Sequence, residues 1–256
     1  MTSILPADVP LLEAGDPSAR PALVLHGGGG PRTVAPIVGQ LAATLHAFAP
    51  THPGWDGTPR PESVASVADL AHAYLARLVD RGERDVVVVG SSIGGWIALE
   101  MAVQAAAHER YDGVIGALVV VDTVGAVVDG EPIADFFALD ARGLAEVAWH
   151  DPERGFMDPA RLTDEQRAMQ QENGKTMRAV AGTSMSDPTL LDRLVVVKVP
   201  TLVVWGASDR VVTPAYGRAV AAAVPGATFV EIAAAGHLPH LEAPAATWAA
   251  IDSFLG

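Results

Sequence analysis

Short runs of apolar, often β-branched residues alternate along most of the chain with stretches whose apolar positions recur every three or four residues. Residues 86–89 are four consecutive valines, and residues 114–121 form another almost uniformly apolar run. Runs of this kind are typical of strands buried on both faces of a parallel sheet. Residues 64–81 have helical spacing, and residues 95–107 are so apolar that they predict a deeply buried helix. Repeated alternation of this kind predicts an α/β fold with a mostly parallel central sheet flanked by helices.

The same alternation extends to both ends of the chain. We expect further strands at residues 22–25, 46–49, 201–205 and 228–232, and further helices at residues 37–45, 214–223 and 244–254. The length of 256 residues suits one α/β domain with an inserted subdomain.

The alternation stops between about residues 123 and 193. No convincing buried strand occurs there, whereas residues 132–149 and 158–181 have an amphipathic, helical pattern. Thr163 and Gln166 have the spacing of a capping box at the start of the second helix. We therefore expect residues 1–123 and 194–256 to form the core, and residues 124–193 to form a helical cap over the carboxyl edge of the sheet. An ordinary long crossover with two helices is the alternative.

The sharpest chemical signal is a Gly-x-Ser-x-Gly pattern at residues 90–94, between the valine strand and the apolar helix. A sharp turn from strand to helix crowds its own backbone, and glycines two positions before and after Ser92 remove the Cβ atoms that would clash. The turn then projects Ser92 outward at the end of the strand, with the N-terminus of the next helix behind it. This context predicts that Ser92 is a nucleophile.

A serine hydroxyl reacts only when a base takes its proton, and the base needs a carboxylate that orients it. Asp209 follows the strand expected at residues 201–205, and His237 follows the strand expected at residues 228–232. Both residues are therefore expected at the carboxyl edge of the sheet, where Ser92 lies. The pattern predicts Ser92 as nucleophile, Asp209 as orienting acid and His237 as base.

Each of these residues also has an ordinary structural interpretation. Ser92 could be a helix N-cap, a role that serine often fills, although a cap does not need glycines on both sides. Asp209 could be a solvated turn residue and His237 a surface loop residue. Ser91 is a rival nucleophile, and His240 is a rival base.

Four glycines follow His26, directly after the strand expected at residues 22–25. Acyl transfer needs backbone N–H donors directed at the developing oxyanion, and glycine lets the backbone approach closely. We expect the N–H groups of Gly28 and Ile93 to form this oxyanion hole. A phosphate-binding loop is the competing interpretation, but no Lys-Ser/Thr pair follows, and Pro31 comes next.

Several motifs together resemble those of the α/β-hydrolase superfamily. They lie at residues 26–29, 52–58, 90–95, 206–209 and 236–244. The resemblance spans about residues 22–254, apart from the insertion.

This resemblance implies the α/β-hydrolase fold, with Ser92 as nucleophile, His237 as base and Asp209 as the partner of the histidine. The insertion then corresponds to the cap, which shapes the substrate pocket in such enzymes. Relatives with aspartate in place of the nucleophilic serine, such as dehalogenases and epoxide hydrolases, are disfavoured by Ser92.

Composition narrows the class of partner. The chain has 30 acidic and 17 basic residues, a formal net charge of −13, which argues against binding to nucleic acid or anionic membranes. It has no cysteine, which excludes disulfides, thiolate metal sites and cysteine nucleophiles. Residues 1–3 begin no secretory signal, and no apolar run is long enough to span a membrane, so we expect a cytoplasmic protein. We expect a small-molecule substrate and neither a metal nor a cofactor, and a homo-oligomer is possible.

The predicted function is that of a carboxylesterase-like serine hydrolase, acting on a small to medium, largely apolar neutral ester or lactone through an acyl-enzyme on Ser92. The alternatives are a C–C bond hydrolase of a vinylogous diketone, a cofactor-free perhydrolase, and a small-molecule receptor with slow or no turnover. The candidates for contact with the substrate are Gly29, Trp96, Phe136, Phe137, Trp149 and Leu238, with Phe156, Met157 and Met185 as further apolar candidates of the insertion. His52 and Asp56 are interpreted mainly as loop structure.

Overall fold

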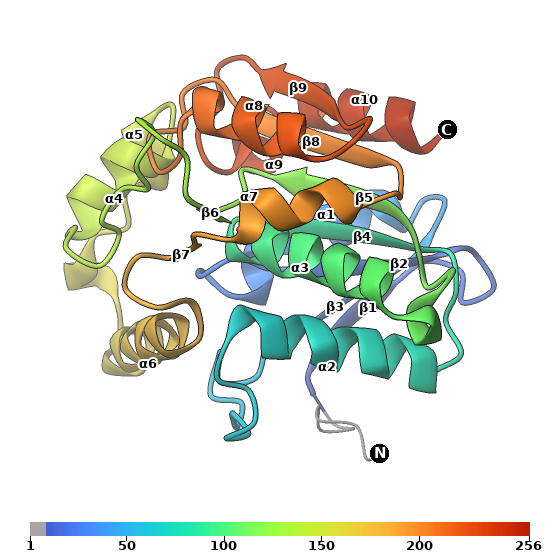
Figure 1. Ribbon diagram of the computed structural model, residues 1–256. Coiled ribbons are helices and arrows are strands. Elements are labelled where there is room, and N and C mark those ends of the chain that lie inside the picture. The colour runs from blue at the N-terminus through green and yellow to red at the C-terminus, as the bar shows by residue number, and fades with distance from the viewer. Residues whose placement is uncertain (1–8) are drawn as a thin grey trace.

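The computed structural model describes residues 9–256, which build a seven-stranded sheet with helices on both faces (Figure 1). The strand order is β1-β3-β2-β4-β5-β8-β9, and only β1 runs antiparallel to its neighbour. The strands are β1 (Leu11–Ala14), β2 (Pro21–Leu25), β3 (His46–Pro50), β4 (Val86–Ser91), β5 (Ile115–Val121), β8 (Thr201–Gly206) and β9 (Thr228–Ile232). The predicted fold class, a mostly parallel sheet flanked by helices, is confirmed. The first residues of the chain, on which the expectation about a secretory signal depends, lie outside the described residues.

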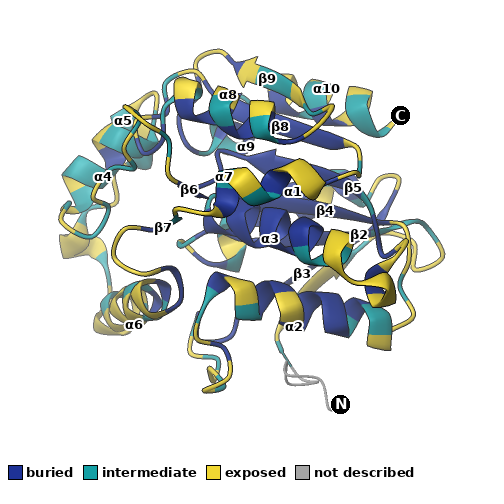
Figure 2. Cartoon of the chain, viewed as in Figure 1, coloured by how far each residue is buried: buried dark blue, intermediate teal, exposed yellow. Residues whose placement is uncertain are grey.

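Alternate side chains of the central strands enter two separate cores, one on each face of the sheet. Val86 and Val88 pack into the core under α2, α3 and α8, whereas Val87 and Val89 pack into the core under α1 and α10. These helices are α1 (Ala35–Leu41), α2 (Val67–Asp80), α3 (Ile93–Ala107), α8 (Pro214–Ala223) and α10 (Pro244–Leu255). Burial on both faces explains why β4 reads as an unbroken valine run rather than as an alternating pattern. The dark interior of the sheet is visible in Figure 2.

Residues 124–193, which we call the inter-strand segment, lie in the connection from β5 to β8, and their helices α4, α5 and α6 stand at one side of the sheet (Figure 1). The elements of the whole connection are β6 (Gly125–Ala126), α4 (Ala141–Ala148), α5 (Pro152–Gly155), η3 (Pro159–Arg161), α6 (Asp164–Ala181), β7 (Ser186–Asp187), α7 (Leu190–Arg193) and η4 (Leu194–Val196). Most side chains of α4 to α6 are exposed or half-buried, in contrast to the sheet (Figure 2). The capping box is confirmed, because Thr163 and Gln166 each accept a hydrogen bond from the backbone N–H of the other.

The predicted helix at residues 132–149 is wrong in its first half. The helix begins only at Ala141, because the side chain of Asp140 accepts a hydrogen bond from the Gly143 N–H and caps it there. Earlier in the segment, the Ala134 N–H donates to the Val211 carbonyl at 2.9 Å, which draws the backbone to the loop after β8. This long-range contact has no signature in the local pattern.

Other boundaries differ by a few residues. The helix expected at residues 64–81 begins at Val67, because Ser66 caps it by accepting from the Asp69 N–H. The helix expected at residues 95–107 begins two residues earlier, at Ile93. The short strands β1, β6 and β7 were not predicted, since four or two residues give no measurable periodicity.

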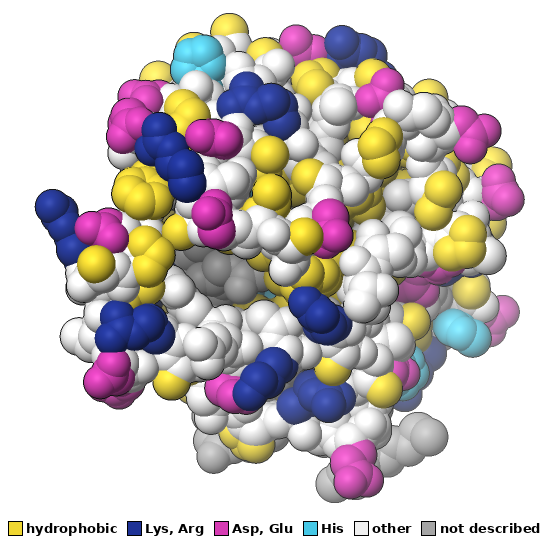
Figure 3. All heavy atoms as spheres, turned by 90° about the vertical axis from the view of Figure 1, so that its left-hand side faces the viewer, with side chains coloured by type: hydrophobic (Ala, Val, Ile, Leu, Met, Phe, Trp, Pro, Cys, Tyr) yellow, Lys and Arg dark blue, Asp and Glu magenta, His cyan; other side chains and the backbone are white. Residues whose placement is uncertain are grey.

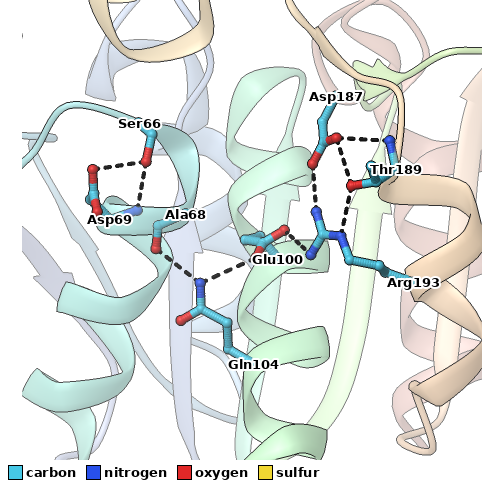
Figure 4. Close-up of polar contacts among 8 residues, drawn as sticks. All are labelled: Ser66, Ala68, Asp69, Glu100, Gln104, Asp187, Thr189 and Arg193. Carbon is cyan, nitrogen blue, oxygen red and sulfur yellow. Dashed lines mark hydrogen bonds and ion pairs between the residues drawn. The ribbon is translucent and has the colours of Figure 1, made fainter.

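A polar network joins the end of the inter-strand segment to the helices beneath it (Figure 4). The guanidinium of Arg193 lies 2.8 Å from the Glu100 carboxylate on α3 and 2.6 Å from the Asp187 carboxylate in β7. Gln104 donates both to Glu100 and to the Ala68 carbonyl of α2. Glu100 is buried, so Arg193 balances a charge that would otherwise be isolated.

No helix within residues 9–256 has both the length and the apolar character that crossing a membrane requires.

Candidate active site

Ser92 lies at the sharp turn between β4 and α3. Its backbone has φ 56° and ψ −121°, a conformation that residues other than glycine rarely adopt. The turn is so tight that a Cβ atom on Gly90 would overlap the Gly94 carbonyl, and one on Gly94 would overlap the Leu25 carbonyl. Ser92 occupies the N-cap position of α3, but its side chain makes no capping hydrogen bond. The simple capping role is therefore not the one that the side chain performs.

The Ser92 side chain instead contacts His237. Ser92 Oγ lies 2.9 Å from Nε2 of His237, and Nδ1 of the same ring lies 2.8 Å from Oδ2 of Asp209. The three residues follow β4, β9 and β8 and meet at one edge of the sheet. The hydroxyl donates to Nε2 when the imidazole carries its proton on Nδ1, where the proton faces the carboxylate.

The Asp209 carboxylate is buried and held by backbone groups. Its Oδ1 accepts hydrogen bonds from the N–H of Val211 at 2.8 Å and of Val212 at 3.3 Å. Oδ2 thereby remains directed at His237. These two N–H donors fix the orientation of the carboxylate.

The rival residues have other environments. The Ser91 hydroxyl is buried and has no hydrogen-bond partner within the described part of the chain. His240 donates from Nε2 to the Thr33 carbonyl at 2.9 Å, and its burial lowers the pKa of the imidazole to about 4. The structure thus brings Ser92 and His237 together, and neither rival takes part in that contact.

The glycine-rich loop passes directly beside Ser92. A Cβ atom on Gly27 would lie 3.0 Å from Cβ of Ser92. Between residues 9 and 256, no acceptor is hydrogen-bonded to the N–H of Gly28 or of Ile93. Their role as an oxyanion hole stays a prediction.

Two buried histidines support this loop. The His26 ring accepts from the His52 N–H at 2.9 Å and donates to the Gly27 carbonyl at 2.7 Å. His52 contacts the Tyr74 hydroxyl at 2.6 Å. Burial lowers the pKa of His26 to about 4 and that of His52 well below its usual range. Both rings are therefore neutral at neutral pH, and His52 has the structural role that its loop position suggested.

The inter-strand segment contacts the loops that hold Asp209 and His237. The Ala148 carbonyl accepts from the His237 N–H at 2.7 Å. The carboxylate of Glu242 accepts from the N–H of Gly236 at 2.6 Å and from that of His150 at 3.0 Å. The backbone around His237 is thus supported by residues of the segment as well as by the core.

Helix α6 contacts the loops that follow β2 and β3. Asp56 and Asn173 form a reciprocal pair of hydrogen bonds, each of 2.8 Å. The Thr176 hydroxyl donates to the Gly54 carbonyl at 2.9 Å. A Cβ atom on Gly28 would lie 2.5 Å from the sulfur of Met177, which places this thioether at the predicted oxyanion loop. Sequence analysis did not single out Met177, because its place depends on how α6 packs.

The predicted substrate contacts occupy varied positions. Trp96 is buried against Gly125, the Arg178 guanidinium lies 4.4 Å above the Phe137 ring, and Trp149 packs on Gly155. A cavity of about 340 Å³ is lined by residues 126–128, 131–135 and 183–186. Of the predicted residues Gly29, Trp96, Phe136, Phe137, Trp149, Leu238, Phe156, Met157 and Met185, only Met185 lines this cavity. Contact between the other residues and a substrate stays a prediction.

The face formed by α4, α5 and α6 is shown in Figure 3. Acidic, basic and apolar side chains are mixed on it around a central hollow. No single sign of charge covers this visible face, so its charge pattern alone does not select a polyanionic or polycationic ligand.

A family model described as "Alpha/beta hydrolase family" matches residues 22–250. This chain belongs to the alpha/beta hydrolase family. The matched residues include the strands and loops that carry Ser92, Asp209 and His237, and they also include the whole inter-strand segment.

The individual relatives of this alpha/beta hydrolase have low sequence identity to it. Polyketide synthase ThaQ of Burkholderia thailandensis is 29% identical over 93% of this chain, which spans only 12% of that protein. A putative lipase from Acinetobacter baumannii AYE superposes with a TM-score of 0.78 at 22% identity, covering 96% of this chain and 86% of that one. A 2-hydroxy-6-oxo-6-phenylhexa-2,4-dienoate hydrolase from Rhodococcus sp. strain RHA1 gives a TM-score of 0.73 at 22% identity, with 96% and 93% coverage. At these identities the structural likenesses show a shared fold.

Sequence analysis did not single out one residue that lies directly behind Asp209 and His237. Asp122 follows β5 directly, and an oxygen of Asp122, an oxygen of Asp209 and a ring nitrogen of His237 all lie within 4.8 Å of one another. Both ring nitrogens of His237 and both oxygens of Asp209 already make hydrogen bonds, an arrangement that suits transfer of the Ser92 proton to Nε2 while Nδ1–H stays on the carboxylate. The sequence signal that could have identified Asp122 is its position directly after β5, the strand that pairs with β8.

Proposed function

We propose that this protein is a serine hydrolase that cleaves a small to medium, largely apolar neutral ester or lactone. The observation that carries the proposal is the hydrogen-bonded chain from Ser92 Oγ through His237 to Asp209, with distances of 2.9 and 2.8 Å. These are the contacts that a hydroxyl needs if an imidazole is to take its proton and a carboxylate is to stabilise the resulting charge. Family membership supports the same class of chemistry.

In the first step, Ser92 Oγ attacks the acyl carbonyl while Nε2 of His237 takes the hydroxyl proton. The new C–O bond places negative charge on the former carbonyl oxygen, which the N–H groups of Gly28 and Ile93 stabilise. Each such donor lowers the free-energy barrier by on the order of 3 kcal/mol. The protonated imidazole keeps its Nδ1–H on Asp209 and passes the Nε2 proton to the departing alcohol.

In the second step, the acyl-enzyme is hydrolysed. Nε2 of His237 takes a proton from water, whose oxygen attacks the acyl carbon, and the same two N–H groups stabilise the oxyanion. Collapse of this intermediate releases the acid and returns the proton to Ser92 Oγ. A lactone gives a hydroxy acid, because its leaving alcohol stays attached to the acyl group.

We further propose that residues 124–193 act as a cap that shapes the substrate pocket. Supporting this role, Met177 of α6 lies at Gly28, and the Ala148 carbonyl accepts from the His237 N–H. The buried side chains of Met177 and Trp96 are apolar and would favour an uncharged acyl group.

The decisive experiment is pre-steady-state hydrolysis of p-nitrophenyl esters of increasing acyl length, together with labelling by a fluorophosphonate. We expect a burst of p-nitrophenol and stoichiometric labelling, both lost in Ser92→Ala. Ser91→Ala is the matched control, because it removes the neighbouring hydroxyl and should keep burst and label. Labelling that survives in Ser92→Ala, or no burst with any ester, would refute the assignment. The burst measures acylation of a serine and therefore also separates an enzyme from a receptor without turnover.

Cleavage of a C–C bond is a second candidate, and the likeness to the Rhodococcus hydrolase favours testing it. A vinylogous diketone acid would be supplied to the wild-type protein and to Ser92→Ala. Product formation in the wild type, with ketonisation alone in the variant, would indicate this branch, whereas ester turnover without diketone cleavage would exclude it.

Two other activities can be tested in the same preparation. Adding halide and peroxide in acetate buffer tests perhydrolase activity. Acyl thioesters extend the panel of substrates because of the likeness to part of ThaQ.

A further inference from the structure

A second carboxylate lies behind the Ser92–His237–Asp209 chain and has no role in the reaction proposed above. The side chain of Asp122 is fully buried, at 0% exposure. Its Oδ1 accepts a hydrogen bond of 2.8 Å from the N–H of Gly206, the last residue of β8. No N–H or O–H donor among residues 9–256 is directed at its Oδ2. Burying an unpartnered carboxylate oxygen is costly, so this group needs a physical explanation.

The two acidic side chains differ in how many donors they face. Asp209 accepts hydrogen bonds from the N–H of Val211, the N–H of Val212 and the imidazole of His237. Asp122 accepts only the one from Gly206. One oxygen of each carboxylate lies within 4.8 Å of the other and of a His237 nitrogen. Two carboxylates this close in a dry site do not both ionise, and the proton stays on the one with fewer donors.

The surroundings of Asp122 also favour its protonated form. Burial raises the pKa of the Asp122 carboxyl well above its usual range, and the negative charge of Asp209 raises it further. The N–H of Gly206 opposes this rise, whereas the side-chain contact with Asp209 and the negative charge of Glu242 add to it. No cation contacts Asp122 among the described residues.

We propose that Asp122 is a positioning residue that stays protonated in the working enzyme and directs its Oδ2–H at the Asp209 carboxylate. This inference rests on the proposed function, because Asp122 acts only through Asp209 and His237. A neutral donor at this place restricts rotation of the Asp209 carboxylate, so that Oδ2 of Asp209 continues to face Nδ1 of His237. It also limits the charge behind the imidazole to that of one carboxylate. A second negative charge would favour the protonated imidazole and leave less of the neutral form that can take the Ser92 proton.

A pair of substitutions tests the positioning role by activity. Asp122 has φ 45°, which asparagine and glycine both tolerate, so neither replacement adds backbone strain. Asp122→Asn keeps an acceptor for the Gly206 N–H and supplies a neutral N–H donor toward Asp209. We expect its kcat to stay within about threefold of wild type, with an unchanged pH profile. Asp122→Gly removes both groups, and we expect kcat to fall by about tenfold or more while KM changes by less than about twofold.

A spectroscopic measurement tests the protonation state without using activity. We expect wild-type protein with isotope-labelled aspartate to show, at pH 7, the infrared carbonyl stretch of a protonated carboxylic acid. The band should be absent in Asp122→Asn. This comparison needs only the wild type and the conservative variant, so it stands even if Asp122→Gly does not fold.

The outcomes distinguish this inference from the proposed function. If Asp122→Asn lowers kcat as much as Asp122→Gly does, a negative charge is required there and the inference is wrong. Wild-type kcat in Asp122→Gly, or the absence of the infrared band from the wild type, would equally overturn it. If the band is present but Ser92 is neither labelled nor acylated, the proposed function fails while the protonated Asp122 remains.

Discussion

Ser92 is held in a backbone conformation that is unfavourable for an L-amino acid. Its φ of 56° and ψ of −121° belong to a region populated mainly by glycine, and such a conformation costs on the order of 1–3 kcal/mol. The packing of Gly90 and Gly94 against neighbouring carbonyls leaves the turn little room to relax. The strain is thus maintained by the surrounding fold, and it places Oγ within reach of His237.

This strain predicts a difference between two variants that both lack the hydroxyl. Ser92→Gly should be more stable to unfolding than Ser92→Ala by about 1 kcal/mol, because glycine adopts the positive φ freely while alanine does not. Urea unfolding of both proteins at pH 7.5 measures the difference, and neither should hydrolyse esters. Equal midpoints for the two variants would show that the turn is not strained.

The Asp209 side chain predicts the tautomer of His237. In Asp209→Asn the shape is retained, but the amide favours the imidazole with its proton on Nε2, which cannot accept the proton of Ser92. We expect kcat for a p-nitrophenyl ester to fall by about 10⁴-fold, with little change in stability. Asp252→Asn, at an exposed position on α10, is the control and should retain wild-type activity. A loss of less than about tenfold in Asp209→Asn would contradict the assigned role of the carboxylate.

At the scale of elements, helix α3 contributes to two contacts that are far apart along its length. Its N-terminus follows Ser92, and one face near its middle carries the buried Glu100. Arg193 joins Glu100 to Asp187, and so joins α3 to the end of the inter-strand segment (Figure 4). The position of the segment is therefore coupled to the helix that begins at the nucleophile.

Removing the Arg193 cation alone should lower the free energy of unfolding more than removing the charges of Arg193 and Glu100 together. Arg193→Met leaves Glu100 buried without a basic partner, and we expect a loss of about 2 kcal/mol in the free energy of unfolding, less than for a fully buried pair because Arg193 is one-third exposed. The double variant with Glu100→Gln should regain part of this loss. Denaturant unfolding of both single variants and the double variant completes the cycle. A double variant that is less stable than Arg193→Met would show that Glu100 is not destabilised by isolation.

Elements buried on both sheet faces could be predicted from the sequence, and so could the edge that carries Ser92. Each depends on local facts, namely an unbroken valine run and glycines that relieve crowding two positions before and after the serine. Asp209 and His237 follow buried strands, so their meeting with Ser92 followed from the topology of a parallel sheet.

The inter-strand segment could not be predicted to the same depth. The amphipathic pattern before Asp140 indicated a helix, but a hydrogen bond from Ala134 to Val211 holds that stretch in another conformation. Asn173 and Met177 lie on α6 and contact loops more than a hundred positions earlier in the chain. In the sequence, Asp122 is only the first polar residue after the apolar run at residues 114–121. Such contacts depend on how elements pack, which the spacing of apolar residues does not encode.

At the scale of the whole molecule, four buried groups govern how stability depends on pH. Burial lowers the pKa of His26 and His240 to about 4 and that of His52 well below its usual range, and it raises the pKa of Asp122. Below pH 6.5 the unfolded chain protonates the three histidines while the folded chain does not. Above about pH 4 the folded chain keeps a proton on Asp122 that the unfolded chain loses. Between these values, unfolding therefore takes up two protons net.

The free energy of unfolding should consequently fall as the pH falls from 6 to 5, by roughly 2–3 kcal/mol for the one-unit change. In Asp122→Asn the opposing proton is absent, so close to three protons are taken up and the decrease should be larger by about 1 kcal/mol. Urea unfolding at a series of pH values measures both slopes. A stability that is constant or higher at pH 5 would show that the buried histidines are not neutral in the folded protein.

The hydrogen bond from the His237 N–H to the Ala148 carbonyl has a consequence for engineering. A chimera that exchanged residues 124–193 for the equivalent stretch of a relative would change the backbone support of the imidazole together with the substrate pocket. The chimera would then show altered substrate selectivity and impaired turnover at the same time. A graft designed to separate them should retain residues 147–150, with Glu242 as their partner in the core, and vary only the sequence on either side.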